Sequence, residues 1–297
     1  MPPSTFSYTS ADGTPIAAYR WDPAGQPRGL RAAVQLTHGM GEHARRYEHV
    51  ARALNEAGFV VYAQDHRGHG ASADPGALGD LGEGSWPGLV DDIGLLSARI
   101  RAEHPGLPLI LLGHSMGSFA VQQYLFEHSA DADGVVLTGT AAIDLLEGAL
   151  DLDQPIDLSA FNAPFQPART DYDWLTRDEA IVDAYVADPR CGFGIDPSSA
   201  RAMFAGARRG ADPAQVAAIR AGLPLYIAVG EADPVNAGLV LLTPLTERYQ
   251  AAGLTDVTVR TYPAARHEIL NETNRAEVIA ELTSWLDRVV TATPAAG

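Results

Sequence analysis

The chain has 297 residues, and 46% of them are hydrophobic, which is enough for a substantial core in one large domain or two ordinary ones. A formal net charge of −16 repels nucleic acid and anionic lipid head groups, so neither is an expected partner. The single cysteine, Cys191, excludes an internal disulfide and any metal site built from cysteines.

The opening stretch and the apolar runs of the sequence predict where the protein is located. The opening stretch "MPPSTFSYTS" has no basic region and no apolar segment, so we expect no signal peptide. No apolar run approaches the length of a membrane span. We therefore expect a soluble cytoplasmic protein with no stable membrane insertion, in which any membrane contact is transient and made through the cap described below. All 21 basic residues are arginines, which together with many alanines indicates a GC-rich bacterial genome.

Strand-like and helix-like patterns alternate along most of the chain. Residues 5–21 predict a hairpin, because Asp12-Gly13 is a favourable turn. The further expected strands are 32–37, 59–64, 108–112, 134–138, 224–229 and 256–261. The expected helices are 45–57, 86–103, 116–129, 236–251 and 274–290. Several of the strands are almost entirely apolar, as in a parallel sheet covered on both faces, so the pattern predicts an α/β fold.

The alternation stops between residues 141 and 205. This segment holds a proline-rich stretch, 154–167, that predicts no regular element, and an amphipathic helix at 177–187. It carries twelve acidic and four basic residues, a net charge of −8. We expect its interleaved apolar residues to face a lipid tail and its acids Asp144, Glu147 and Asp151 to stay in water. The apolar residues are Ile143, Leu145, Leu146 and Leu150. A long insertion between two strands is more often functional than a bare linker. We expect a core of residues 1–140 and 206–297, with residues 141–205 forming a mainly helical cap over the carboxyl edge of the sheet.

An apolar strand runs directly into a helical pattern at "LILLGHSMGS", residues 109–118. It contains the only Gly-x-Ser-x-Gly of the sequence, centred on Ser115. In a sharp strand-to-helix turn the serine is exposed above the sheet, and side chains in place of Gly113 and Gly117 would collide with backbone. The alternative, an ordinary helix N-cap, does not need both glycines. The context predicts Ser115 as a nucleophile.

A serine hydroxyl needs a base, and on this type of sheet the order is serine, acid, histidine. Only His128 and His267 follow Ser115. His128 lies further along the same expected helix, about 20 Å away at 1.5 Å per residue, so His267 is the expected base. The acid is expected in "GEADPVN", after the preceding strand, where spacing alone does not choose between Glu231 and Asp233.

Five segments together resemble the monoacylglycerol lipase and lysophospholipase branch of the α/β-hydrolase family. They are "HGMGEHARRY" at 38–47, "DHRGHGAS" at 65–72, "GHSMGS" at 113–118, "GEADPVN" at 230–236 and "RHEILNE" at 266–272. The resemblance implies the α/β-hydrolase fold and a triad of Ser115, Asp233 and His267, because the family's acid is the aspartate of a Gly-x-x-Asp loop. Ser118 departs from the commonest family form, which has a third glycine, but a small residue still allows close packing.

The negative oxygen that forms when Ser115 attacks an ester is best stabilised by preorganised backbone N–H groups. One donor is expected from Met116, which follows the nucleophile, and the other from the loop after the third strand. That loop is "HGMG", residues 38–41, whose glycines let the backbone turn an N–H inward. Met40 is the expected second donor, as in the matching loop of the family.

The charged residues after this loop have two interpretations. By resemblance, Glu42 and Arg46 help to bind the glycerol end of the substrate. The alternative is that Glu42, Arg45 and Arg46 cap and solubilise the helix that starts near residue 45.

The segment "DHRGHGAS" places Asp65, His66 and His69 close together. We expect a structural loop there rather than a metal site, because a catalytic metal needs three well-placed ligands and an open position. The resemblance also makes this loop structural. No cofactor is expected.

These observations predict a serine hydrolase that cleaves monoacylglycerols or similar single-chain acyl esters through an acyl-enzyme intermediate. A lysophospholipase or a broad carboxylesterase would share every catalytic residue. A non-catalytic binding protein can also have this fold, but the intact set of Ser115, Asp233 and His267 argues against it. Dehalogenases and epoxide hydrolases of the same fold carry an aspartate where this chain has Ser115. The acyl chain length, the regiochemistry and the oligomeric state do not follow from the sequence.

Overall fold

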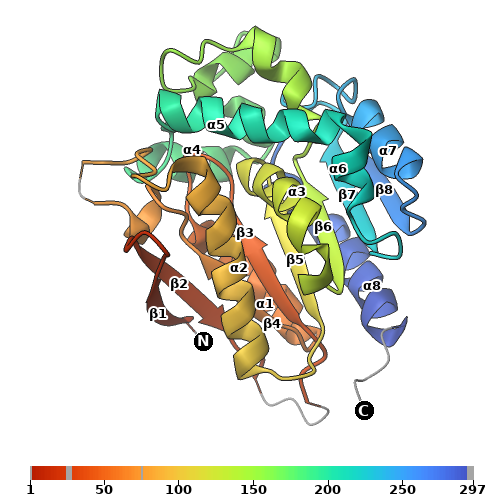
Figure 1. Ribbon diagram of the computed structural model, residues 1–297. Helices are drawn as coiled ribbons and strands as arrows, with labels where there is room; N and C mark the ends of the chain where they lie inside the picture. The colour runs from red at the N-terminus through yellow and green to blue at the C-terminus, as the bar shows by residue number, and fades with distance from the viewer. Residues whose placement is uncertain (1, 25–28, 75, 293–297) are drawn as a thin grey trace.

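The computed structural model describes residues 2–24, 29–74 and 76–292 (Figure 1). Within these ranges eight strands form one sheet in the order β1-β2-β4-β3-β5-β6-β7-β8. Their bounds are Ser4–Thr9 (β1), Pro15–Trp21 (β2), Ala33–Thr37 (β3), Val60–Gln64 (β4), Leu109–His114 (β5), Gly134–Thr138 (β6), Leu225–Gly230 (β7) and Val257–Tyr262 (β8). β2 pairs antiparallel with β1 and β4, and the other neighbours are parallel. The expected hairpin and mostly parallel sheet are confirmed.

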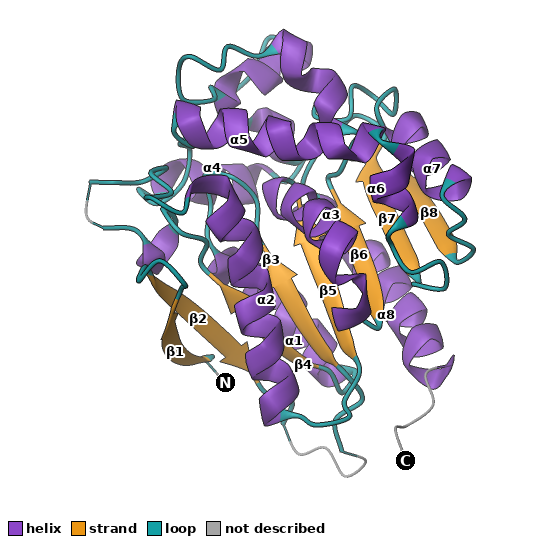
Figure 2. Cartoon of the chain, viewed as in Figure 1, coloured by secondary structure: helices purple, strands orange, loops and turns teal. Residues whose placement is uncertain are grey.

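Helices cover both faces of the sheet (Figure 2). Helices α2 (Ser85–Glu103) and α3 (Met116–His128) lie on one face, and α1 (Glu48–Glu56) and α8 (Arg275–Ala292) lie on the other. Because successive side chains of a strand point to opposite faces, Leu111 packs in the core with α2 and α3, whereas Ile110 packs with α1 and α8. Both faces of β5 are therefore buried, which explains its continuous apolar sequence.

One predicted helix starts later than expected. The sequence pattern predicts a helix over 236–251, but α7 spans only Leu242–Ala251. Ala237, Gly238 and Leu239 have φ angles of 53°, 62° and 76°, which are left-handed values that a right-handed helix cannot contain. The side chain of Asn236 accepts a hydrogen bond from Leu239 N at 2.7 Å and stabilises this turn instead.

The inserted segment lies over the carboxyl ends of the strands (Figure 1). It contains α4 (Glu179–Ala187) and α5 (Pro197–Arg208), and it leads into the short α6 (Pro213–Ala217). The sequence pattern does not predict α5, although Asp196 caps it and Pro197 begins it. The proline-rich stretch forms a 3₁₀ helix at Leu158–Phe165. The expected boundary at residue 205 falls inside α5, and the chain rejoins the sheet only at β7.

None of the helices within the described ranges combines the length and the apolar composition that a membrane span requires.

Candidate active site

Ser115 lies in the sharp turn between β5 and α3, with φ of 51° and ψ of −123°. A positive φ at a non-glycine residue costs about 1–3 kcal/mol, so the fold must enforce it. A Cβ on Gly117 would lie 2.3 Å from Thr37 O, and one on Gly113 would lie 2.7 Å from Gly117 O, so both glycines are required by close backbone approach. The Ser115 side chain makes no capping hydrogen bond to α3, which removes the N-cap alternative.

Two loops at the same edge of the sheet bring Asp233 to His267. Nδ1 of His267 lies 2.9 Å from both carboxylate oxygens of Asp233. Both side chains are buried. A Cβ on Gly230 would lie 2.2 Å from the carbonyl oxygens of Ala265 and Arg266, so this glycine lets the two loops pack together. Because Nδ1–H donates to the carboxylate, Nε2 is left to accept a proton.

The other sequence candidates lie elsewhere. Glu231 is exposed and accepts a hydrogen bond from Thr261 Oγ1 at 3.0 Å, so it does not contact His267. His128 stacks on Tyr124 at the end of α3, with ring centroids 4.7 Å apart, and about half of its side chain is exposed. The structure therefore brings Asp233 rather than Glu231 to His267, and it leaves His128 apart.

The pKa of His267 is raised above its usual value of 6.5. Burial alone would lower it, because burial disfavours the charged imidazolium. The negative charge of Asp233, the hydrogen bond to it, and the more distant carboxylates of Glu268 and Glu42 outweigh this penalty. The imidazole is thus a stronger base than an unperturbed histidine.

The loop at residues 38–43, which we name the oxyanion loop, packs against Ser115. A Cβ on Gly39 would lie 3.1 Å from Ser115 Cβ, so the loop backbone directly adjoins Ser115. Met40, Ser115 and Met116 line the same cavity. Met116 is the first residue of α3, so its N–H has no acceptor within the helix. The two residues expected to supply backbone donors, Met40 and Met116, therefore both line the cavity that Ser115 lines.

This cavity lies between the sheet and the cap, and its empty space, part of which is open to solvent, amounts to about 560 Å³. Its wall is mostly apolar, and it becomes polar near Ser115. The apolar lining includes Phe119, Ile143, Leu146, Leu150, Ile156, Leu158, Phe161, Trp174, Leu175, Met203, Phe204 and Val235. The polar lining includes Glu42, His114, Tyr185, His267 and Glu268. Such a cavity suits a long apolar chain with one polar end.

A buried charge network closes the polar end. Nη1 of Arg46 lies 2.5 Å from Glu42 Oε2 and 2.5 Å from Glu268 Oε1. The other oxygen of Glu42 accepts Gly39 N–H and Tyr47 O–H, each at 2.6 Å. Burial and the nearby charge of Glu268 raise the pKa of Glu42. For Glu268 burial opposes ionisation, but Arg46 outweighs it and lowers the pKa to about 2.

Sequence reasoning missed Glu268, although an acidic residue directly after the expected base was visible in "RHEILNE". Of the two residues expected at the glycerol end, Glu42 lines the cavity and Arg46 does not. Arg46 instead binds the two carboxylates and lies over the Tyr185 ring, 4.7 Å from its centroid.

The "DHRGHGAS" loop makes structural contacts. The Asp65 carboxylate accepts hydrogen bonds from Tyr19 O–H, Ala44 N–H and Ala71 N–H, at 2.7–2.9 Å. His69 Nε2 accepts Gly41 N–H at 3.2 Å, so this loop supports the oxyanion loop.

Two other groups of side chains in the described part of the chain are spaced as metal ligands would be: Glu42, His114 and Glu268, and His43, Asp188 and Cys191. In each group a guanidinium already supplies the cation. Arg46 binds both acids of the first group, and Arg190 Nη2 lies 2.8 Å from Asp188 Oδ2 in the second. A cation of the protein is therefore already present beside the acids of each group.

The cap acids do not all lie in water as expected. The side chain of Asp144 is only 8% exposed and forms a two-pronged ion pair with Arg248, with distances of 2.7 and 2.8 Å. The expectation of a solvated Asp144 is therefore wrong, because Arg248 of α7 reaches it. Glu147 pairs with Arg208 at 2.6 Å, and Asp151 is exposed. Of the interleaved apolar residues of the cap, Ile143, Leu146 and Leu150 line the cavity, whereas Leu145 is 52% exposed and does not line it.

The chain is similar to several known proteins. The family described as serine aminopeptidase, S33, matches residues 28–274. The chain is 34% identical to the monoacylglycerol lipase of Mycolicibacterium smegmatis over 95% of this chain and 96% of that protein. It is 28% identical to human monoglyceride lipase over 94% and 89% of the two chains. A solved carboxyl esterase from Bacillus coagulans, in complex with glycerol, superposes with a TM-score of 0.84 at 28% identity, over 98% of this chain and 99% of that chain.

Proposed function

Because the chain belongs to the serine aminopeptidase, S33, family, it is a serine hydrolase with the α/β-hydrolase fold, and we propose that it cleaves monoacylglycerols or similar single-chain acyl esters. One observation carries the proposal: the Asp233–His267 pair and the strained Ser115 lie at the polar end of an otherwise apolar cavity. The similarity to monoacylglycerol lipases supports the same substrate class.

In the proposed reaction, Nε2 of His267 takes the proton of Ser115 Oγ as this oxygen attacks the ester carbonyl. The carbonyl oxygen becomes negative and accepts hydrogen bonds from Met40 N–H and Met116 N–H. His267 then gives the proton to the leaving alcohol, and the acyl group stays on Ser115. Water, activated by His267, hydrolyses the acyl-enzyme and releases the fatty acid. Asp233 holds the imidazole and stabilises its charged form.

We propose that the apolar part of the cavity holds the acyl chain and that Glu42 and Glu268 face the alcohol. Both carboxylates line the cavity. Arg46 does not line it, so its proposed contribution is to hold the two carboxylates in place rather than to contact the glycerol end directly.

A broad carboxylesterase is the second candidate, favoured by the structural match to the Bacillus coagulans esterase. A hydrolysis panel of monoacylglycerols, lysophosphatidylcholine, triacylglycerol and simple aryl esters separates the candidates. A clear preference in kcat/KM for monoacylglycerols supports the first proposal. Equal turnover of aryl esters supports the second, and a preference for lysophosphatidylcholine indicates a lysophospholipase. No turnover, together with no labelling of Ser115 by a fluorophosphonate, would favour a binding protein.

The raised pKa of His267 predicts the pH dependence of the reaction. His267 must be neutral to act as the base. Because its pKa lies above 6.5, it loses its proton only above that pH, so kcat/KM should rise with pH along a limb whose midpoint lies above pH 6.5. Glu268→Gln removes one of the charges that raise this pKa, so the limb should move to lower pH. The measurement is kcat/KM of a neutral ester between pH 5 and 9. A wild-type limb below 6.5 would contradict the prediction.

The charge of the cap predicts discrimination against anionic substrates. Negative charge around the cavity mouth disfavours anions through a potential that salt screens. We expect a neutral monoacylglycerol to exceed a matched anionic lysophospholipid in kcat/KM by about threefold or more at low salt, and the preference to narrow at high salt.

The test of this charge effect uses Glu147→Gln with Asp151→Asn, and it spares Asp144 because its removal would strand Arg248. The double variant should narrow the preference and leave the neutral ester almost unaffected, with both substrates below their micellar concentrations. An anionic substrate that is equal or better at low salt would reject the hypothesis and favour a phospholipid-directed enzyme.

A further inference from the structure

Residues 185–193 of the cap, which we name the cap turn, form hydrogen bonds with the oxyanion loop. Tyr185 O–H donates a hydrogen bond to Gly41 O at 2.8 Å, and Gly192 N–H donates to the same oxygen at 2.9 Å. Tyr185 is only 3% exposed. The carbonyl that receives both bonds belongs to the residue directly after Met40, the proposed oxyanion donor.

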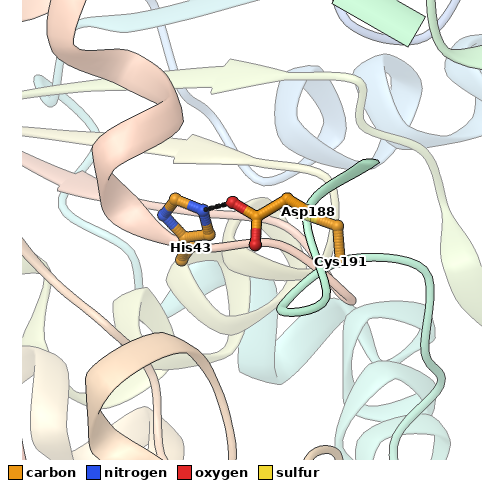
Figure 3. Close-up of side chains that lie close together, drawn as sticks. All are labelled: His43, Asp188 and Cys191. Carbon is orange, nitrogen blue, oxygen red and sulfur yellow. Dashed lines mark hydrogen bonds and ion pairs between the residues drawn. The ribbon is translucent and has the colours of Figure 1, made fainter. Parts of the chain in front are cut away.

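A second link joins the same two segments. Nε2 of His43 lies 3.0 Å from Asp188 Oδ2, and Figure 3 shows the Asp188 carboxylate facing the imidazole, with Cys191 following in the cap turn. His43 is buried, with 4% of its surface exposed. The cap turn therefore holds the oxyanion loop at two points, one and three residues beyond Met40.

The backbones of the two segments are also in direct contact. Gly41 has a φ of 65°, and a Cβ at this position would lie 2.4 Å from Phe193 O. With this spacing the cap turn cannot move towards or away from the sheet without changing the packing at Gly41.

The core and the cap hold opposite sides of the oxyanion loop. On the core side, Glu42 accepts Gly39 N–H and His69 accepts Gly41 N–H. On the cap side, Gly41 O is the acceptor. Peptide planes are rigid, so fixing Gly39 N and Gly41 O leaves little freedom for Met40 N–H between them.

We propose that the cap turn is a positioning element for the oxyanion hole, with Tyr185 and Asp188 as positioning residues. The inference rests on the proposed roles of Ser115 and Met40. Oxyanion donors act only within a narrow range of distances, so a small displacement of Met40 lowers the rate of the chemical step. The cap thus acts on catalysis as well as enclosing the acyl chain.

The test is Tyr185→Phe, which removes one hydroxyl and keeps the ring. We expect kcat to fall about tenfold with KM changed less than about twofold. Because Tyr185 also lines the cavity, the test compares p-nitrophenyl acetate, which has a short acyl group, with a long-chain ester. The loss should be equal for both. The affinity for a methyl trifluoromethyl ketone, whose adduct with Ser115 fills the oxyanion hole, should fall by a similar factor.

The matched control is Tyr172→Phe. Like Tyr185, Tyr172 donates its O–H to a backbone oxygen, in this case Gly192 O at 3.0 Å. Both partners of this bond belong to the cap, so it does not reach the oxyanion loop. This variant should retain kcat within about twofold, and thermal unfolding should show both variants folded. Asp188→Asn should also lower kcat, but by a smaller factor than Tyr185→Phe does, since the amide oxygen can still accept a hydrogen bond from His43.

Three results would overturn the inference: unchanged kcat in Tyr185→Phe, a loss confined to the long-chain ester, or an equal loss in Tyr172→Phe. The second would make Tyr185 a substrate contact only, and the third would indicate general loosening of the cap. If the wild-type protein cleaves no ester, the proposed function itself fails, which is a distinct outcome.

Discussion

Replacing Ser115 with alanine should lower kcat/KM for ester hydrolysis by about 10⁴-fold or more. The alanine keeps the turn but removes the oxygen that attacks the carbonyl, and no acyl-enzyme can form. The small residual rate would come from the oxyanion donors and from substrate binding. Turnover of a monoacylglycerol and labelling by a fluorophosphonate are the measurements.

The fold should survive this change, because the cost of the positive φ at Ser115 is similar for alanine. Thermal unfolding of the variant should therefore resemble that of the wild type. Ser284→Ala, on the exposed side of α8, is the matched control and should keep full activity. Near-normal turnover by purified Ser115→Ala would reject the proposed mechanism.

Replacing Asp233 with asparagine should lower kcat by about 10³–10⁴-fold. The amide can donate its own N–H to Nδ1 of His267, which places the remaining proton on Nε2, where it cannot accept the proton of Ser115. Asparagine has nearly the same shape as aspartate, so the loss should appear in kcat more than in KM.

Glu231→Gln is the control for this variant, since it removes a carboxylate from the same loop without contact to His267. Its activity should stay within about threefold of the wild type, as for most exposed substitutions. The reverse ranking of the two variants would show that Glu231 supplies the acid.

The central strands and the turn around Ser115 could be predicted from sequence because local patterns determine them. The strand expected at 134–138 has the observed bounds of β6, and the bounds of the others differ by no more than two residues at either end. Strands β3 to β7 are buried along their whole length, so their apolar runs mark them directly, whereas the edge strand β8 is partly exposed. The glycines around Ser115 are required by contacts within a short segment.

Features that depend on distant partners could not be predicted. Arg46 binds Glu268, which is 222 residues away in the sequence. Arg248 of α7 binds Asp144 of the cap, which is 104 residues away. Neither pairing leaves a local pattern. Helix α5 is a different case, because its sequence does carry local signals: Asp196 caps it, Pro197 begins it, and buried apolar residues recur at helical spacing, namely Ala200, Met203, Phe204 and Ala207.

The cap enters the chain between β6 and β7, which are neighbours in the sheet. Removing or exchanging it would leave the hydrogen-bond ladder of the sheet complete, so such an insertion is free to diversify during evolution. The hydrogen bonds from the cap turn to Gly41 O limit that freedom. A cap transplanted from a relative would bring a new acyl pocket, but it would also need a matching turn against the oxyanion loop. In this lineage, substrate range and catalytic rate would therefore be inherited together rather than as exchangeable modules.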